Sequence, residues 1–139
     1  MKWSHVALNC RDIDTTARWY RDLFGFRTAR VVPVGDDRIV FLRAGDAYLE
    51  LFAAEGKARA GTADGPAAAG HARHLAFQVD DVDEFTAGLG ADVPITLGPL
   101  SFDEFIPGWR TVWVRDPDGV VVEVSQGYVD DPAAGVRDD

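Results

Sequence analysis

Two histidines and two glutamates occupy matching places in the two halves of this 139-residue chain. His5 and His74 each open an apolar segment, and Glu50 and Glu123 each lie within a later one. A carboxylate inside an apolar strand carries a desolvation cost that a partner has to offset. Two imidazoles and two carboxylates at equivalent positions suggest one common partner. A divalent cation fits this role, because the four side chains supply ligands and leave room for solvent or substrate oxygens.

The two histidines begin a repeated sequence, which identifies the strands that must position them. HVALNCRDID starts at residue 5 and HLAFQVDDVD at residue 74, and the two align without a gap. Apolar and polar side chains alternate in both, so each repeat predicts a half-buried strand with its histidine on the face opposite the core positions. His5 precedes Glu50 by 45 residues and His74 precedes Glu123 by 49 residues, which is consistent with one such unit in each half.

A helix is predicted after each repeated strand. Residues 13–24 carry apolar side chains at helical spacing, with Asp12 or Asp14 as the N-cap and Gly25 as the terminator. The apolar stripe of this helix is expected to cover one face of a sheet.

The second helix is shorter, and three more strands complete each half. Asp81 and Glu84 form a capping box at its start, and Gly90 ends it. The strands are expected at residues 26–34, 38–44 and 47–53 and at residues 95–101, 109–115 and 119–125. The turn sequence 116–119, Asp-Pro-Asp-Gly, joins the last two strands. Both halves are therefore predicted to be βαβββ modules of an α+β protein.

The length suits one domain, expected at residues 1–129. Its modules cover about 3–53 and 71–126, and residues 54–70 connect them. Twelve of these 17 connecting positions are Ala, Gly or Pro, which predicts a flexible linker. Residues 130–139 have the same character and are expected to form a flexible tail.

The chain resembles the vicinal oxygen chelate superfamily, which includes glyoxalase, bleomycin-resistance and extradiol-dioxygenase proteins. The resemblance covers about residues 3–126 and rests on the two repeated openings, RWYRDLFGF, YLELF and RDPDGVVVEVSQ. It implies a vicinal oxygen chelate fold, with two βαβββ modules that form a curved mixed sheet around a central cleft. In a metal-binding member the ligands would fall on His5, Glu50, His74 and Glu123.

The resemblance also implies what such a site would do. The first hypothesis is a divalent-metal-dependent lyase or isomerase of glyoxalase type that binds vicinal oxygens of a small substrate. The cation, Ni, Co, Zn, Mn or Mg, would stabilise an enediolate-like state, and Glu123 or Glu50 would act as the catalytic residue that moves the proton. The four-ligand set is similar to that of glyoxalase I. It is somewhat similar to that of methylmalonyl-CoA epimerase, which has a Gln at the position equivalent to Glu50.

Two alternatives stay open. One is a drug- or metabolite-binding protein without catalysis, similar to bleomycin-resistance proteins, which the acidic charge and the four Trp residues favour. The other is a small extradiol-type dioxygenase that uses iron(II). A fourth protein ligand at Glu50 argues against this reaction, because oxygen and substrate need open metal positions.

Aromatic residues are the candidates for a substrate cleft. The loop 100–109 is one candidate lining, and an ordinary connection with its aromatic side chains in the core is the alternative. The predicted cleft residues are Tyr48, Phe52, Phe102, Phe105, Trp109 and Trp113. Four arginines are candidates for holding a substrate carboxylate or phosphate, although each is more typical of a solvated surface: Arg27, Arg30, Arg43 and Arg110.

Composition limits the partners. The net charge of −9 argues against nucleic acid and anionic membranes, and 12 of the 14 cationic residues are arginines that can still cluster locally. Cys10 is the only cysteine, so no intrachain disulfide can form. With no signal peptide or apolar run of membrane-spanning length, the sequence predicts a cytoplasmic protein. The resemblance implies a small-molecule substrate or ligand and a homodimer.

Overall fold

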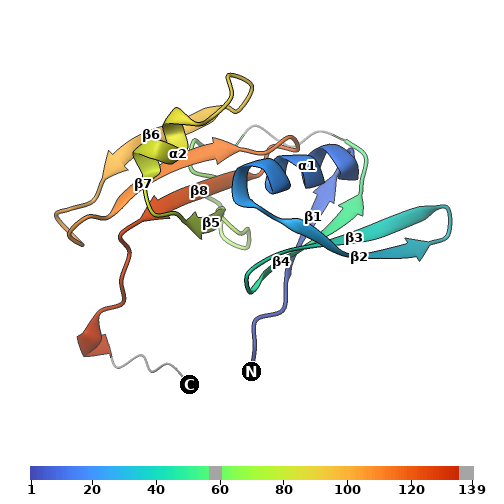
Figure 1. The fold of residues 1–139 in the computed structure, drawn as a ribbon, viewed down its shortest axis with the longest axis horizontal. Coiled ribbons are helices and arrows are strands. Elements are labelled where there is room, and N and C mark those ends of the chain that lie inside the picture. The colour runs from blue at the N-terminus through green and yellow to red at the C-terminus, as the bar shows by residue number, and fades with distance from the viewer. Residues whose placement is uncertain (57–60, 135–139) are drawn as a thin grey trace. The chain divides into compact units, whose positions relative to one another are not determined.

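The computed structural model describes residues 1–56 and 61–134 (Figure 1). The chain divides into two compact units, and each is described by itself. Unit 1 is Met1–Ala60 with Asp116–Gly119, and unit 2 is Gly61–Arg115 with Val120–Asp139. None of the helices in the described ranges is long and apolar enough to cross a membrane.

Unit 1 contains one βαβββ module. Its elements are β1 (Val6–Cys10), α1 (Ile13–Phe24), β2 (Arg27–Val34), β3 (Asp37–Ala44) and β4 (Ala47–Ala53). The strands form one sheet in the order β1-β4-β3-β2. Strand β1 runs parallel to β4, and the other neighbours are antiparallel. The first and last strands of the module are therefore neighbours in space, as a site that uses both requires.

Helix α1 begins and ends where the sequence predicts. The Asp12 carboxylate accepts hydrogen bonds from the backbone N–H groups of Asp14 and Thr15, which satisfies donors that the first turn leaves free. Gly25 has a φ of 71°, in the left-handed region that a glycine adopts without strain and that commonly ends helices. The buried side chains of the helix are Ile13, Thr16 and Tyr20.

The core of unit 1 lies where α1 packs against β3 and β4. Each strand contributes alternate residues to it, as period-two patterning requires. The buried strand side chains are Leu8, Cys10, Val40, Leu42, Leu49 and Leu51. Cys10 is fully buried and forms part of this core. On the other face of β1, Ala7 and Asn9 are exposed.

Unit 2 contains the second βαβββ module. Its elements are β5 (Leu75–Gln78), α2 (Val82–Ala87), β6 (Ile95–Ser101), β7 (Arg110–Arg115) and β8 (Val121–Gln126). The sheet order is β5-β8-β7-β6, with β5 parallel to β8 and the other neighbours antiparallel. The α+β class and the two βαβββ modules predicted from the sequence are confirmed. A short 3-10 helix, Pro132–Ala134, lies within the predicted tail.

Helix α2 differs from the prediction at its C-terminus. It ends at Ala87, and Gly88 rather than Gly90 is its C-cap. The N–H of Gly88 donates to the carbonyls of Glu84 and Phe85, at 3.1 and 3.2 Å, which tightens the last turn and closes the helix early.

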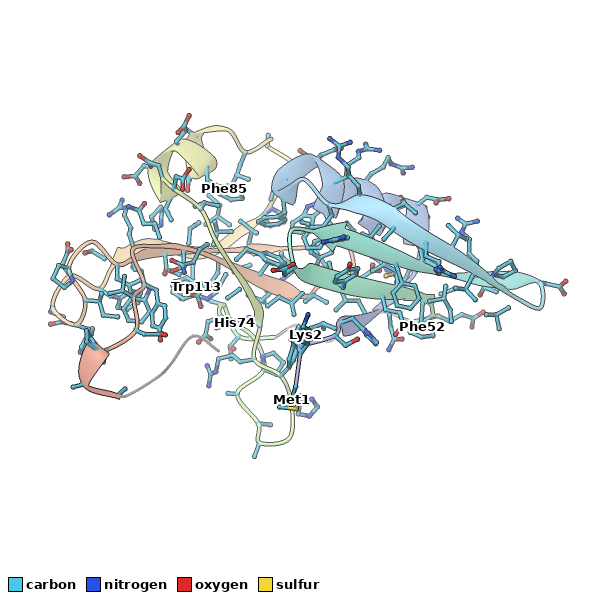
Figure 2. All side chains as sticks on the ribbon, turned by 60° about the horizontal axis from the view of Figure 1, so that its bottom comes forward. Met1, Lys2, Phe52, His74, Phe85 and Trp113 are labelled. Carbon is cyan, nitrogen blue, oxygen red and sulfur yellow. The ribbon has the colours of Figure 1, made fainter. Side chains whose placement is uncertain are left out.

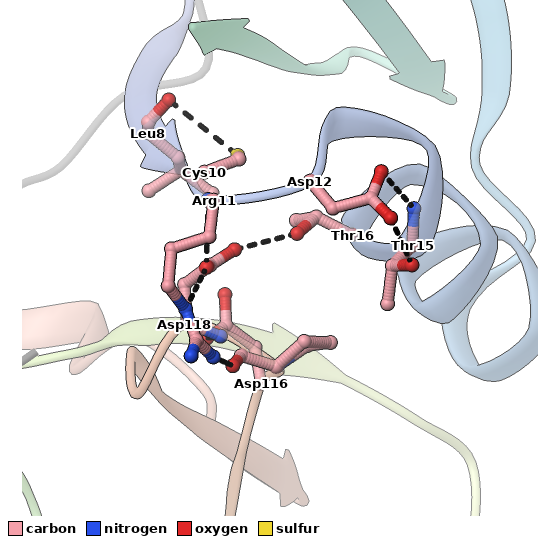
Figure 3. A network of polar contacts seen from close by, with 9 residues as sticks. Leu8, Cys10, Arg11, Asp12, Thr15, Thr16, Asp116 and Asp118 are labelled. Carbon is pink, nitrogen blue, oxygen red and sulfur yellow. Dashed lines mark hydrogen bonds and ion pairs between the residues drawn. The ribbon is translucent and has the colours of Figure 1, made fainter. Parts of the chain in front are cut away.

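The segment Asp116–Gly119 does more than form a turn between β7 and β8, because its side chains bind α1 and Arg11 (Figure 3). The Asp118 carboxylate accepts from the backbone N–H of Arg11 at 2.9 Å and from the Thr16 hydroxyl at 2.6 Å. The buried Tyr20 hydroxyl donates to Asp116 at 3.1 Å. Burial raises the pKa of Tyr20 well above its usual value of 10.0. These contacts hold Asp116–Gly119 against α1 within unit 1.

The predicted linker and tail lie partly outside the described residues, at positions 57–60 and 135–139. The described end of the linker makes specific contacts. Thr62 pairs with Gly65 in an isolated bridge, and the Arg73 guanidinium binds the Asp64 carboxylate at 2.7 Å. This ion pair lowers the pKa of Asp64 below its usual value of 3.8. A peptide rich in small residues thus contains a defined turn at Thr62–Gly65.

Candidate functional site

The structure brings His5 and Glu50 together in unit 1. In the parallel pairing of β1 with β4, Ala7 lies opposite Glu50, and His5 is two residues earlier on the same face of the strand. His5 Nε2 lies 3.0 Å from Glu50 Oε2. The Glu50 side chain is 15% exposed and the His5 side chain 36% exposed, so solvent reaches the pair at this edge of the sheet.

Unit 2 contains an equivalent pair. Ala76 lies opposite Glu123 in the parallel pairing of β5 with β8, and His74 precedes Ala76 by two residues. His74 Nε2 lies 2.7 Å from Glu123 Oε2, and the two side chains are 21% and 13% exposed. The same register therefore produces the same His–Glu contact in both modules.

Further groups orient the histidine and the glutamate of unit 2. His74 Nδ1 lies 2.8 Å from the backbone carbonyl oxygen of Asp64. A carbonyl can only accept, so Nδ1 carries the hydrogen and Nε2 is turned toward the carboxylate. The hydroxyl of Thr111, which is fully buried, donates to Glu123 at 3.3 Å. In unit 1, His5 Nδ1 contacts the Ser4 hydroxyl at 2.9 Å.

The donor atoms of both pairs fit a divalent cation. An imidazole whose Nδ1–H binds a carbonyl presents its Nε2 lone pair, which is the usual arrangement around metal-bound histidine. A lone pair 2.7 Å from a carboxylate oxygen requires a proton or a metal ion between the two atoms. Two ligands about 2.1 Å from one cation and at right angles to each other lie about 3.0 Å apart. The separations in the His5–Glu50 and His74–Glu123 pairs, 3.0 and 2.7 Å, are close to this value.

Each pair by itself contains two side chains of the types that bind metal ions. Among the residues that the structure describes, no group of three or more His, Cys, Asp or Glu side chains could hold a metal ion. The four-ligand set of His5, Glu50, His74 and Glu123 thus stays a prediction about how the two pairs act together.

Four of the six predicted cleft residues gather in unit 2. Phe102 contacts Trp109, with ring centroids 4.9 Å apart, and also Phe105 and Trp113. Trp113 lies beside His74, at 6.4 Å between ring centroids (Figure 2). Trp113 is the cross-strand neighbour of Glu123 and is 6% exposed, whereas Phe105 is 68% exposed. The aromatic side chains of the loop 100–109 thus form a series of contacts from the exposed Phe105 to Trp113, which lies beside His74.

The other two predicted cleft residues belong to unit 1. Tyr48 lines a groove there that also includes His5. Phe52 is half-buried on β4 and is not part of the groove lining. Of the four candidate arginines, Arg110 is bound to Asp83 in unit 2 at 2.8 Å, and the other three line the groove of unit 1.

The sequence did not reveal two residues that support the His74–Glu123 pair. Asp64 acts through its backbone carbonyl, which has no side-chain signature. Thr111 follows Arg110 in an apolar strand, where a threonine is ordinary by composition. Its position opposite Ser125 and near Glu123 depends on the register of β7 with β8, which appears only in the folded sheet.

Comparison with known protein families gives a match over most of the chain. The model of the glyoxalase/bleomycin resistance protein/dioxygenase superfamily matches residues 2–124. No curated protein matches the chain at a significant level.

Solved structures share the fold. The fosfomycin resistance protein FosX from Mesorhizobium loti has 21% sequence identity, with 92% of this chain and 93% of that chain covered and a TM-score of 0.68. FosX from Listeria monocytogenes, in complex with Mn(II) and sulfate, has 17% identity, coverages of 92% and 93%, and a TM-score of 0.67. A glyoxalase family protein from Enterococcus faecalis has 26% identity, coverages of 89% and 96%, and a TM-score of 0.66.

Proposed function

The chain belongs to the glyoxalase/bleomycin resistance protein/dioxygenase superfamily, and on this premise we propose that it is a divalent-metal-dependent enzyme acting on a small molecule with adjacent oxygens. Its reaction would be a proton transfer at a carbon next to a carbonyl, as in a lyase or isomerase of glyoxalase type. The single observation that carries the proposal is the repeated contact of a histidine Nε2 with a glutamate oxygen, at 3.0 and 2.7 Å.

The proposed ligands are His5, Glu50, His74 and Glu123. A bound divalent cation would supply Lewis-acid chemistry, because it polarises substrate oxygens and lowers the cost of charge that develops on them. Mn(II), which the FosX structure from Listeria monocytogenes contains, is the first cation to test, followed by Ni, Co, Zn and Mg. Iron(II) belongs to the dioxygenase alternative.

The chain's own residues would hold and move the proton. Glu123 and Glu50 have the carboxylate oxygens needed for a general base that takes a proton from carbon and returns it. Thr111 supports Glu123 by donating to it, and the Asp64 carbonyl keeps the His74 ring in one orientation. The buried indole of Trp113 beside His74 excludes water from one side of the pair.

Metal binding is the first test. Protein stripped with EDTA is titrated with Mn(II), Ni(II) and Zn(II) by calorimetry, for the wild type and for the variants His5→Ala and His74→Ala. His71→Ala is the matched control, because this histidine is exposed and takes no part in either pair. We expect near-stoichiometric binding that both pair variants weaken and the control retains. Absence of binding even after reconstitution would favour the drug- or metabolite-binding alternative.

Turnover is the second test. With the hemithioacetal of methylglyoxal and with small α-hydroxy ketones in deuterated water, the metal-loaded protein should exchange the proton next to the carbonyl. Glu50→Gln and Glu123→Gln, tested singly, should abolish this exchange and leave the circular dichroism unchanged. Full exchange in both variants contradicts the assigned roles. Oxygen consumption with a catechol and iron(II) would establish the dioxygenase instead.

The proposed homodimer can be tested in the same preparation. Chains carrying His5→Ala and chains carrying His74→Ala are inactive alone if both histidines serve one cation. Exchange activity regained on mixing them would require sites built from two chains. Activity that stays lost on mixing, with a dimer seen by sedimentation, would place both pairs of a site in one chain.

A further inference from the structure

A groove of about 1190 Å³ opens on unit 1 beside His5. It is lined by the residues before β1 and by parts of β2, β3 and β4. The cationic side chains in the lining are Lys2, Arg27, Arg30 and Arg43. The lining contains no Asp or Glu, although the whole chain has a net charge of −9. The groove is therefore a locally cationic site on an acidic protein, and such a site attracts small anions.

A bulge in β2 places two of these arginines on the same face of the sheet. Arg27 lies opposite Arg43 and Arg30 lies opposite Phe41, with a register shift between Thr28 and Arg30. Residues three apart on a regular strand point to opposite faces, and the extra residue of a bulge turns the second side chain back to the first face. Bulges of this kind often re-aim a side chain beside a functional site.

The guanidinium groups of Arg27 and Arg30 are free to bind a ligand. Neither has an ion-pair or hydrogen-bond partner among the residues that the structure describes. Arg43 is already held, because its Nε donates to the Gly45 carbonyl at 2.7 Å and its guanidinium lies 5.3 Å from the centre of the Tyr48 ring. Arginine binds carboxylates and phosphates through two parallel N–H donors, which suits an oxyanion between two such forks.

Aromatic rings also line the groove. Trp3, Phe41 and Tyr48 line it, and Phe41 meets the His5 ring edge to face at 5.8 Å between centroids. A ligand that contacts these rings and reaches the arginines needs an apolar or aromatic body with an anionic end. His5 lines the same groove, so the body of this ligand would extend toward the His5–Glu50 pair.

We propose that this groove binds the anionic group of the substrate, a carboxylate or phosphate on an apolar or aromatic body, through Arg27 and Arg30. The identification of this ligand as substrate rests on the proposed function, whereas the binding of the anion to the groove does not. The substrate class is thus a small organic acid or phosphate ester whose adjacent oxygens lie near His5.

The test measures binding to metal-free protein, so that it does not depend on catalysis or on a cation. Phenyl phosphate, benzoate and the uncharged benzamide are titrated by calorimetry in EDTA, at low and at raised ionic strength. The variants are the double substitution Arg27→Gln/Arg30→Gln and the control Arg38→Gln. Arg38 lies on β3 and binds Asp14 on the helix-covered side, so the control removes the same charge outside the groove.

We expect at least one of the two anions to bind, and to bind more weakly at raised ionic strength. The affinity for benzamide should be lower than the affinity for that anion by about tenfold or more. The double variant should lose about tenfold in affinity or more, and Arg38→Gln should change it by less than about twofold. A tighter complex with phenyl phosphate than with benzoate would assign a phosphate, and the reverse a carboxylate. Equal binding of benzamide, no binding of either anion, or an equal effect of the double variant and its control would overturn the proposal.

The same variants separate this proposal from the metal-dependent function. The double variant should bind Mn(II) as the wild type does, because neither arginine belongs to a His–Glu pair. Anion binding without metal binding contradicts the proposed function alone. Metal binding without anion binding contradicts the groove alone.

Discussion

Removing the Thr16 hydroxyl should destabilise the protein by about 2 kcal/mol. Thr16 is 1% exposed and its hydroxyl donates to the Asp118 carboxylate at 2.6 Å. A hydrogen bond to a charged group contributes about 1.5–3 kcal/mol, and Thr16→Val removes it with little change in shape. Asp118 keeps the backbone N–H and the Nε of Arg11, at 2.9 and 3.2 Å, so the loss should fall in the middle of this range.

Thr15→Val is the matched control for this measurement. Thr15 is the preceding residue of the same helix, and its hydroxyl donates to the Asp12 carboxylate at 2.8 Å, but this pair is exposed. The two substitutions change the helix propensity equally, so the difference between them reports the buried contact. Thr15→Val should lose clearly less stability. It should also raise the pKa of Asp12 toward its usual value of 3.8, since the hydrogen bond from Thr15 is the main cause of its lowering.

The assay is equilibrium unfolding in urea, followed by tryptophan fluorescence and by circular dichroism. With a slope of about 2 kcal/mol per molar urea, a loss of about 2 kcal/mol lowers the midpoint by about 1 M. Both probes have to give the same midpoint before the shift is converted into a free energy. Equal midpoints for the Thr16 and Thr15 variants would refute the role assigned to the Asp118 contact.

Two further predictions concern buried or crowded residues. Burial raises the pKa of Cys10 from 9.0 to about 11, so at pH 8 the native thiol should react with Ellman's reagent far more slowly than the urea-unfolded chain. Since folding raises this pKa, the contribution of Cys10 to stability is complete below pH 9.0 and should be lost between pH 9.0 and about 11. Urea unfolding across that range measures this loss of stability, and the Cys10→Ala variant should not show it. Gly65→Ala should destabilise the protein more than Gly70→Ala. Both glycines have positive φ, but only at Gly65 would a Cβ overlap the Arg73 carbonyl oxygen. Thermal unfolding of the two variants measures the difference, and equal losses of stability would mean that the clash is relieved at no cost.

Local sequence signals predicted the elements of the fold well. Asp12 and Gly25 marked the ends of α1, because a capping carboxylate and a left-handed glycine act through neighbouring backbone groups. The C-terminus of α2 was predicted at Gly90 rather than Gly88, since two glycines two residues apart offered the same signal. Only the hydrogen bonds of the last turn distinguish between them.

The candidate site was predictable where it depends on strand register and not where it depends on folded loops. Equivalent positions in the two repeats predicted that His5 would accompany Glu50 and that His74 would accompany Glu123. The contact of the Asp64 carbonyl with His74 lay in a segment predicted to be a flexible linker. The bulge that brings Arg27 and Arg30 to one face has no composition signal, so these arginines looked like separate surface residues.

The shared register of the two His–Glu pairs shows that their contact does not depend on the length of the chain between the paired strands. In both modules the histidine is two residues before the alanine opposite the glutamate, yet the glutamate follows the histidine by 45 residues in one module and by 49 in the other. The net difference of four residues lies between the paired strands, where α1 has 12 residues and α2 has 6, and it leaves the parallel strand contact the same. Surface loops tolerate such changes far better than paired strands do. Changes in the length of the chain between the paired strands can accordingly alter the surroundings of a His–Glu pair while its register stays the same.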